Sequence, residues 1–378
     1  MIRPEMLCPS WPQKPLGEVV DFLDHLRRPV TDRDRVSGPY PYYGANGQQD
    51  SVADYIFDEP LILMAEDGGY FGDPDRTIAY RVDGKCWVNN HAHVLRPKDG
   101  VDIGFLCRQL EKYDVTKFIK GATRQKLNKS SASEIPITLP PLAEQKRIAA
   151  ILDKADAIRR KRRQTIQLAD EFLRSVFLDM FGDPIRNTKN FPVKPLGELA
   201  SIKRGRFSPR PRNDPRYYGG NYPFIQTGDI NECDSLLLNW KQTLNENGIK
   251  VSYAFQKDTV LIAIVGATIG ATAILGFKSY APDSVIGIVP QNGNLTAEYL
   301  EYSLRFWRPV FLMRAPQTAR ANINIGTLKP LGLPTPDFEL QKNFSTIYRT
   351  ILKLKRRYHC FTDDLFNALF QRAFRGEL

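Results

Sequence analysis

Two stretches of the chain repeat apolar residues at a seven-residue spacing. The first places Ile148, Ala155, Arg162, Ala169 and Val176 seven apart, with a second set, mostly apolar, three positions later. The second stretch does the same with Phe344, Ile351, Tyr358 and Leu365. About five heptads without proline or glycine predict helices of roughly 35 residues, on the order of 50 Å long. We expect an antiparallel coiled coil between them; the alternative is that each helix packs only on its own domain.

The regions outside these helices mix short strands with short helices. Apolar, β-branched runs predict strands over Val260–Val265, Ile286–Val289 and Ile135–Leu139. Helical patterns cover Ile103–Tyr113 and Ala297–Trp307. This mixture predicts α+β domains.

The chain contains one internal repeat. Lys14-Pro-Leu-Gly-Glu returns 180 residues later at Lys194, and the Tyr40-Pro-Tyr-Tyr segment returns 182 residues later at Tyr222. Towards the ends of the two halves, Pro140 is matched 196 residues later by Pro336. The chain therefore consists of two similar halves of about 190 residues, whose loops differ in length.

No segment predicts export or a membrane span. Val260–Phe277 is uncharged over 18 residues, but its glycines and β-branched residues favour a strand, a turn and a second strand. The matching segment of the first half contains Glu66, Asp67 and Asp73, which a membrane helix would not tolerate. The N-terminus lacks a signal-peptide core, so we expect a cytoplasmic protein without a membrane partner.

Composition and charge narrow the class of partner. Hydrophobic residues make up 42% and charged residues 25%, as in globular proteins. The net charge of +11 and the pI of about 9.3 favour an anionic polymer such as nucleic acid. The five cysteines form no C-x-x-C pair, which favours reduced thiols over disulfides or a zinc site.

Motifs for catalysis are weak or missing. Gly266 and Gly270 lack the lysine of a phosphate-binding loop, and the chain has no Asn/Asp-Pro-Pro-aromatic motif of amino-methyltransferases. Glu144-Gln-Lys146 fits half of a nuclease signature but lies at a helix start, where an acidic residue favours the helix dipole. His91 and His93 form an H-x-H pair, which we interpret as packed or hydrogen-bonded rather than metal-binding.

Basic and amide-rich segments recur at the same place in both halves. Arginine suits phosphates and guanine edges, whereas amides read base edges. The basic residues of these segments are Arg27, Arg28, Arg33 and Arg35 in the first half, and Lys203, Arg204, Arg206, Arg210 and Arg212 in the second. The polar and aromatic residues that follow are Tyr42, Tyr43, Asn46, Gln48 and Gln49, and then Gln226, Thr227 and Asp229. Their recurrence favours DNA contacts over ordinary polar turns.

Two further polar features recur between the halves. Arg124 and Asn128 match Arg320 and Asn324, and these pairs either contact DNA or tie the backbone; with Arg124 and Arg320 we count Asn322 as a candidate DNA contact. The runs Arg159–Arg163 and Lys353–Arg357 lie in the middle of the two long helices. Each run is either a solvated face or a basic stripe for DNA phosphate or an acidic partner.

Together these features resemble the specificity (S) subunits of type I DNA restriction-modification systems, over essentially the whole chain. The motifs that support the resemblance are Tyr40-Pro-Tyr-Tyr-Gly-Ala-Asn-Gly, Glu66-Asp-Gly-Gly, Asn90-His-Ala-His-Val-Leu, Leu139-Pro-Pro-Leu-Ala-Glu-Gln-Lys-Arg-Ile, Met180-Phe-Gly-Asp-Pro and Ala373-Phe-Arg-Gly-Glu-Leu.

The resemblance implies an α+β fold with a pseudo-two-fold internal repeat. Two target-recognition domains, residues 1–141 and 183–336, would be separated by two long antiparallel coiled-coil helices, residues 142–182 and 337–378. Each domain would read one half of a split, asymmetric DNA site. A spacer of about 50 Å bounds the distance between the domain centres at about 15 base pairs.

The resemblance also implies partners and the absence of catalysis in this chain. The subunit would bind double-stranded DNA, two methyltransferase subunits and restriction (translocase-nuclease) subunits. S-adenosylmethionine, ATP and Mg would then be cofactors of the partner subunits, with none in this chain. The alternatives are a DNA-binding regulator that acts without partners and a free-standing methyltransferase or nuclease.

Overall fold

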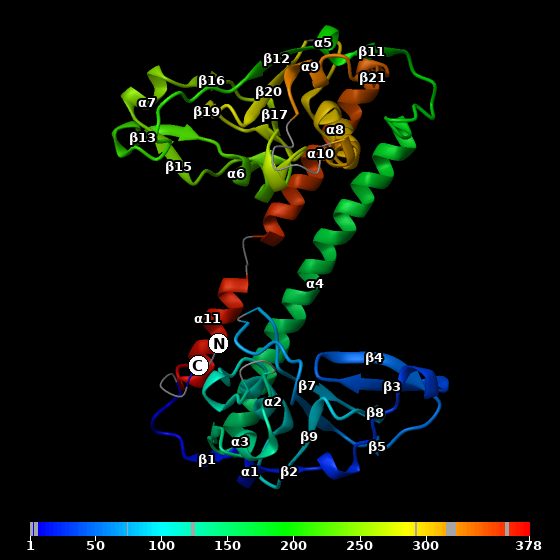
Figure 1. Cartoon of the computed structure of the whole chain (residues 1–378), viewed down its shortest axis with the longest axis vertical. Coiled ribbons are helices and arrows are strands. Elements are labelled where there is room, and N and C mark those ends of the chain that lie inside the picture. Colours follow the sequence, from blue (N-terminus) through cyan, green and yellow to red (C-terminus); the bar gives the residue numbers. More distant parts are fainter. Residues whose placement is uncertain are drawn as a thin grey trace. The chain divides into compact units, whose positions relative to one another are not determined.

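The chain folds into two compact units. Unit 1 comprises Met1–Arg162 with Phe361–Leu378, and unit 2 comprises Arg163–Cys360. The computed structural model (Figure 1) describes residues 3, 7–73, 75–121, 125–291, 293–314, 323–359 and 363–378. Among these residues, no helix is both long enough and apolar enough to cross a membrane.

Unit 1 contains two four-stranded sheets and a short two-stranded one. The first four-stranded sheet has the order β2-β9-β6-β7, the second has the order β4-β3-β8-β5, and β1 pairs with β10. The strands are β1 (Gln13–Pro15), β2 (Val20–Phe22), β3 (Ser37–Gly44), β4 (Gly47–Val52), β5 (Phe57–Asp58), β6 (Leu61–Ala65), β7 (Ala79–Val82), β8 (Lys85–Val88), β9 (Ala92–Pro97) and β10 (Pro136–Thr138). The helices are α1 (Leu16–Val19), α2 (Ile103–Glu111) and α3 (Lys129–Ser133).

Among its described residues, unit 2 repeats this arrangement with one additional strand. Its sheets have the orders β12-β20-β17-β18-β14 and β15-β13-β19-β16, and β11 pairs with β21. The strands are β11 (Val193–Pro195), β12 (Ala200–Arg204), β13 (Tyr218–Phe224), β14 (Leu236–Leu237), β15 (Gln242–Leu244), β16 (Tyr253–Phe255), β17 (Val260–Ala263), β18 (Thr272–Leu275), β19 (Ser279–Ala281), β20 (Val285–Pro290) and β21 (Gly332–Pro334). The helices are α5 (Leu196–Leu199), α6 (Thr227–Glu232), α7 (Glu246–Lys250), α8 (Ala297–Arg314) and α9 (Ile325–Leu328).

The strand pairing confirms the internal repeat. In unit 1, β3 pairs antiparallel with β4 and parallel with β8; in unit 2, β13 pairs antiparallel with β15 and parallel with β19. The uncharged segment Val260–Phe277 forms the antiparallel strands β17 and β18, as its glycines and β-branched residues predict. The predicted α+β class with two similar domains is therefore confirmed.

Long helices complete both cores. Helix α4 (Leu142–Phe181) has 40 residues, and the second heptad stretch forms α10 (Phe338–His359) and α11 (Asp363–Phe374). Residues 360–362 between these two helices lie outside the described residues.

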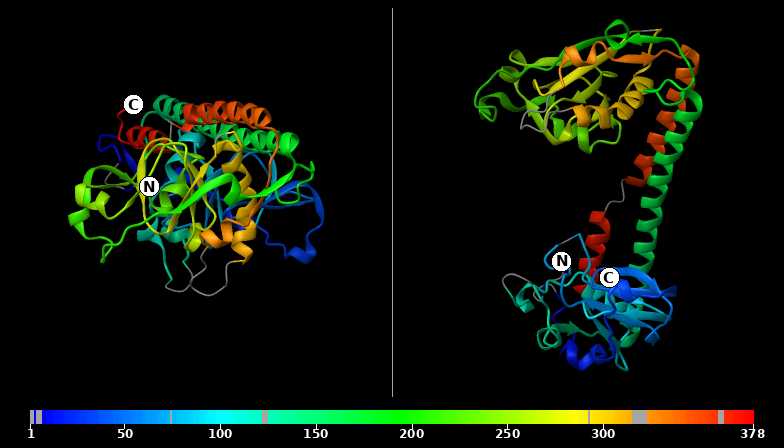
Figure 2. Two further views of the ribbon diagram at one scale, coloured as in Figure 1. Left: turned by 90° about the horizontal axis from the view of Figure 1, so that it is seen from above. Right: turned by 45° about the vertical axis from the view of Figure 1, so that its right-hand side comes forward.

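In each unit, a segment of α4 lies beside one of these helices. In unit 2, α4 runs beside α10, which two views show (Figures 1 and 2). Phe177 packs on Phe344 with ring centres 5.3 Å apart. In unit 1, Arg159 lies over the ring of Phe366 on α11, 4.2 Å from its centre. The predicted antiparallel pairing is thus present within each unit.

A buried glutamine at the start of each long helix holds it on its domain. Gln145 Nε2 donates to the carbonyl oxygens of Pro140 (2.9 Å) and Gly100 (3.2 Å), and its Oε1 accepts from the Asp102 amide (2.8 Å). Gln341 makes the matching bonds in unit 2, with Pro336 O, Asn294 O and the Thr296 amide. The loop before the preceding domain helix is thereby fixed to the start of the long helix in both units.

Candidate nucleic-acid interface

Arg27 and Tyr42 lie inside unit 1. The guanidinium of Arg27 contacts Glu66 Oε2 (2.7 Å) and the Ala92 carbonyl oxygen (2.7 Å), and its side chain is 13% exposed. Tyr42 is 1% exposed, and its hydroxyl hydrogen-bonds with Val30. The sequence pattern predicts that both residues contact DNA. Their burial in the structure indicates instead that they hold the segment before β3 in place.

A buried ion-pair network lies beneath this segment. His93 is bonded to Asp24 Oδ2 (2.7 Å) and the Leu127 carbonyl oxygen (2.8 Å), while Lys126 pairs with Glu66 (2.9 Å). Burial raises the pKa of Glu66, but hydrogen bonds from Arg27 and Lys126 outweigh it and hold the pKa below its usual range. Asp24, Glu66 and His93 are close enough to share a cation. Arg27 and Lys126 already neutralise this site, so we interpret it as structural.

His91 and His93 do not act as one pair. His93 belongs to β9, whereas His91 precedes that strand and is hydrogen-bonded to Asp67. Each histidine thus has its own carboxylate partner, in agreement with the hydrogen-bonded interpretation of the H-x-H motif.

Three amide side chains are exposed around the β3–β4 turn. Asn46 Nδ2 donates to the Gly68 carbonyl oxygen (2.9 Å), and Gln48 Nε2 donates to Asp50 O and Ser51 Oγ. Gln49 Oε1 accepts from Asn89 Nδ2 (3.1 Å). The structure therefore brings the turn together with the Glu66–Gly69 and Asn89–His91 segments. We call this group of three segments the unit 1 tip.

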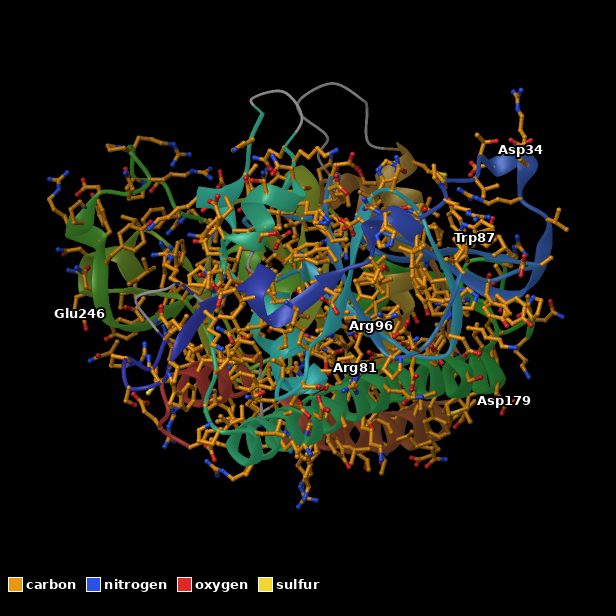
Figure 3. All side chains as sticks on the ribbon, turned by 90° about the horizontal axis from the view of Figure 1, so that it is seen from below. Asp34, Arg81, Trp87, Arg96, Asp179 and Glu246 are labelled. Carbon is orange, nitrogen blue, oxygen red and sulfur yellow. The ribbon has the colours of Figure 1, made fainter. Side chains whose placement is uncertain are left out.

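Arg28 and Tyr43 flank the unit 1 tip. Arg28 is exposed, and its carbonyl oxygen accepts from Trp87 Nε1 (2.6 Å). Figure 3 labels Trp87 and also Asp34, which belongs to the segment before β3. Tyr43 is partly buried against Tyr80, and burial raises the pKa of its hydroxyl.

In unit 2, Asp283 organises the basic segment that begins at the end of β12. Its carboxylate pairs with Arg212 (2.6 Å), and its carbonyl oxygen accepts from Arg204 Nε (2.5 Å). Arg210 NH1 turns back onto the Pro209 carbonyl oxygen (2.8 Å). The exposed Arg206 side chain makes no hydrogen bond or ion pair within the part of the chain that the structure describes. Arg206 is thus the arginine of this segment best placed to bind a phosphate.

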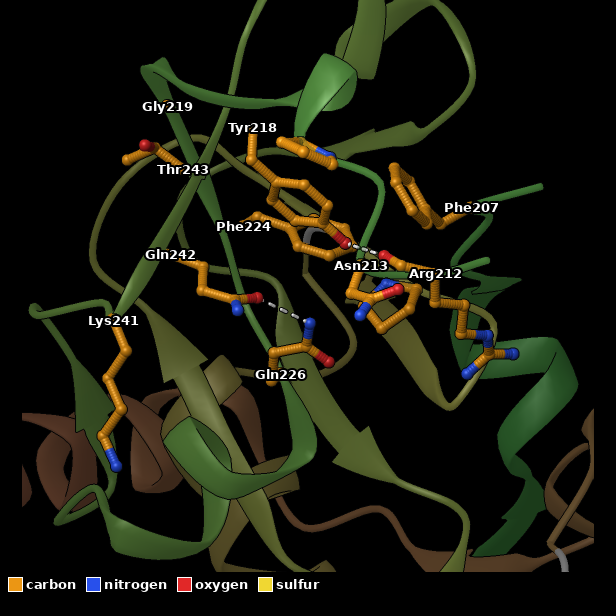
Figure 4. A pocket seen from close by; sticks show the side chains of 12 residues that line it. Phe207, Arg212, Asn213, Tyr218, Gly219, Phe224, Gln226, Lys241, Gln242 and Thr243 are labelled. Carbon is orange, nitrogen blue, oxygen red and sulfur yellow. Dashed lines mark hydrogen bonds between the residues drawn. The ribbon is translucent and has the colours of Figure 1, made fainter. Parts of the chain in front are cut away.

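A pocket of about 620 Å³ opens beside this segment (Figure 4). The buried rings of Phe207 and Phe224 form its apolar wall. Its polar lining includes Arg212, Asn213, Gln226, Lys241, Gln242 and Thr243. Aromatic, amide and cationic groups together are the usual composition of a surface that binds nucleic acid.

Helix starts account for several of the predicted polar residues. Gln226 is the N-cap of α6, Thr227 is its first residue, and Asp229 Oδ2 accepts from the Gln226 amide (2.8 Å). Asn128 and Asn324 cap α3 and α9 by accepting from the amides of Ser131 and Thr327, each at 2.9 Å. The matched asparagines are therefore structural ties. An Asn directly before a helical segment is the sequence signal that identifies such a cap.

Several residues of the predicted DNA contacts and basic runs lie outside the described residues or inside unit 2. Arg124, Arg320 and Asn322 lie outside the described residues. In the basic run of α10, Lys355 is 2% exposed and pairs with Asp170 (2.5 Å) and Asp234 (2.7 Å) within unit 2.

Gln242 and Lys241 were not predicted, because no motif surrounds them; only the pairing of β13 with β15 brings them to the pocket.

The comparisons with known proteins agree with this architecture. A family model described as the type I restriction modification DNA specificity domain matches residues 10–168 and again residues 188–356. A protein of Haemophilus influenzae, assigned as a type I restriction enzyme specificity subunit, is 32% identical over 301 residues, which is 78% of this chain and 76% of that protein. The EcoprrI specificity subunit of Escherichia coli is 25% identical over 149 residues, 39% of this chain and 36% of that protein.

A solved structure shows the same fold. The type I restriction-modification S subunit from M. genitalium has a TM-score of 0.69 and 16% identity, covering 97% of this chain and 96% of that one. Two DNA specificity domains in one chain, each with its own helix, define a DNA-recognition protein. The chain belongs to the specificity subunits of type I restriction-modification systems.

Proposed function

We propose that each unit reads one half of a split, asymmetric DNA site and that the chain positions methyltransferase subunits on it. The observation that supports this proposal is the recurrence of one strand topology with different side chains at matching positions. Gly44 in unit 1 corresponds to Gln226 in unit 2, and Asp50 corresponds to Gln242. Two domains that share one strand topology but carry different polar side chains are suited to bind two half-sites of different sequence.

The exposed side chains divide into two kinds of DNA contact. Arg28 in unit 1, and Arg206 and Arg212 in unit 2, would bind phosphates and set the register on the duplex. Asn46, Gln48 and Gln49 in the unit 1 tip, and the amides lining the pocket in unit 2, would contact base edges. Tyr42 and Arg27 would keep these segments in place from inside.

Catalysis would belong to the partners. The assembled complex would methylate adenine with S-adenosylmethionine, and restriction subunits would use ATP and Mg for translocation and cleavage. The absence of convincing catalytic motifs in the sequence and the chain's membership of a DNA specificity family support this division. We expect the assembly to act in the cytoplasm, where the DNA is.

The test is methylome sequencing of a methylation-free host that co-expresses this chain with its neighbouring methyltransferase gene. The expected result is a split motif with a fixed gap, which disappears when either gene is omitted. A continuous motif, or methylation that persists without this chain, would contradict the proposal. Tight, specific DNA binding by the isolated chain without any methylation would indicate a regulator. Methylation or cleavage by the chain alone would indicate a free-standing enzyme.

A further inference from the structure

A pair of amide side chains lies at the pocket of unit 2. Gln226 Nε2 donates to Gln242 Oε1 (2.9 Å), and both residues line the pocket (Figure 4). Gln226 follows β13 and Gln242 begins β15, so the pair joins two neighbouring strands at one end. Gln242 is exposed and Gln226 is half-buried.

The hydrogen bond between the two amides fixes which groups remain for a ligand. Because Gln242 Oε1 accepts from Gln226, the amide nitrogen of Gln242 must point away from it. The amide nitrogen of Gln242 donates to no group among the described residues. Gln226 Oε1 has two lone pairs, so it keeps an acceptor position although it also caps α6. The pair therefore offers one donor beside one acceptor.

Unit 1 contains an amide pair beside the matching place, built from other positions than Gly44 and Asp50, the counterparts of Gln226 and Gln242. Asn89 Nδ2 donates to Gln49 Oε1 (3.1 Å), and Asn89 Oδ1 accepts from the His91 amide (2.8 Å). Gln49 lies on β4, the counterpart of β15, and its Nε2 donates to no other described group. A Cβ at Gly44, which matches Gln226, would lie only 2.4 Å from Gln49 Nε2. Gly44 therefore leaves the space that the Gln49–Asn89 pair occupies, whereas Gln226, at the same position of unit 2, is itself a member of the pair there.

We propose that the amide pair in each unit reads an adenine base through the major groove. Adenine presents an acceptor, N7, beside a donor, the N6 amino group, and this pattern complements the donor and acceptor of the pair. Guanine presents two acceptors there, so it would leave the amide oxygen without a donor. This inference rests on the proposed function, because it assigns one base contact to each half-site.

The decisive experiment compares methylation motifs of variants in the co-expressed complex. Gln242→Met removes both hydrogen-bonding groups at similar side-chain volume, and Gln242→Glu replaces the donor by an acceptor. Each should reduce the preference for adenine about tenfold or more at one position of the half-site read by unit 2. Gln49→Met should do the same in the other half-site. Asn247→Ala, an exposed amide on α7 of the same unit, is the matched control and should leave the motif unchanged.

The outcomes separate this inference from the proposed function. If the wild-type complex gives no split motif, the proposed function fails. If the wild type gives a split motif and both Gln242 variants retain it, the adenine assignment fails while the proposed function stands. Relaxation at a position that is not adenine on either strand, or at positions in both half-sites, would also overturn the assignment. If Gln242→Glu abolishes methylation altogether, the motif methylated by the Gln242→Met complex tests the adenine assignment instead.

Discussion

Replacing Gln341 by leucine should destabilise unit 2 more than any exposed substitution on the long helices. Gln341 is fully buried, and its amide makes three hydrogen bonds: to Pro336 O (2.9 Å), to Asn294 O (3.1 Å) and from the Thr296 amide (3.0 Å). Leucine has a similar volume but can make none of these bonds.

The expected loss follows from the burial of each bond. The bond to Pro336 is fully buried. Leaving the Pro336 carbonyl oxygen without a donor should therefore lower the free energy of unfolding by about 2 kcal/mol. The other two bonds are partly buried, and losing each should cost about 1 kcal/mol because water can replace the glutamine. Burying the apolar leucine offsets about 1 kcal/mol. The net destabilisation of unit 2 should therefore be about 3 kcal/mol.

Amide hydrogen exchange measures this loss locally. The Thr296 amide loses its acceptor, so its exchange should accelerate on the order of 100-fold, while amides of unit 1 keep their rates. Gln167→Leu, the same change at an exposed site on α4, should alter stability by less than about 0.5 kcal/mol. Gln145→Leu should produce the mirror-image result in unit 1. Unchanged Thr296 exchange in a folded Gln341→Leu protein would refute this account of the helix start.

Three further predictions concern charge, pH and DNA specificity. Arg206→Ala should weaken DNA binding by the assembled complex and lower the slope of log K against log salt by about one, without changing the motif; an unchanged slope removes Arg206 from the phosphate contacts. Because hydrogen bonds from Arg27 and Lys126 outweigh burial and lower the pKa of Glu66, its stabilisation should be complete above pH 4.5 and be lost as the pH falls further. Melting temperatures of the wild type and Glu66→Gln should thus converge between pH 7 and pH 3, and a constant gap would contradict this. Asn46→Ala should alter base preference in one half-site only, and methylome motifs that relax in both would disprove the assignment of one half-site to each unit.

Local sequence patterns predicted the long helices and the duplicated domains. A seven-residue apolar spacing places side chains on one face of a helix whatever surrounds it, so α4 could be read directly from Ile148 to Val176. The strands β17 and β20 are equally local, because their continuous apolar runs suit a buried strand. The repeat of Lys14-Pro-Leu-Gly-Glu at Lys194 then predicted that both halves share one fold.

The candidate site depended on contacts between residues far apart in the chain. The sequence alone does not show that Arg27 would be held by Glu66, 39 residues later, and thus be withdrawn from the surface. Nor does it pair Gln226 with Gln242 across β13 and β15.

The sequence by itself therefore determined the helices, the duplication and the basic, amide-rich character of the loops. Each of these depends on neighbouring residues or on the similarity of two segments. The tertiary structure alone decided which arginines and amides face outward. That choice depends on strand pairing and buried ion pairs, in which a polar side chain is held inside by partners that no local pattern reveals.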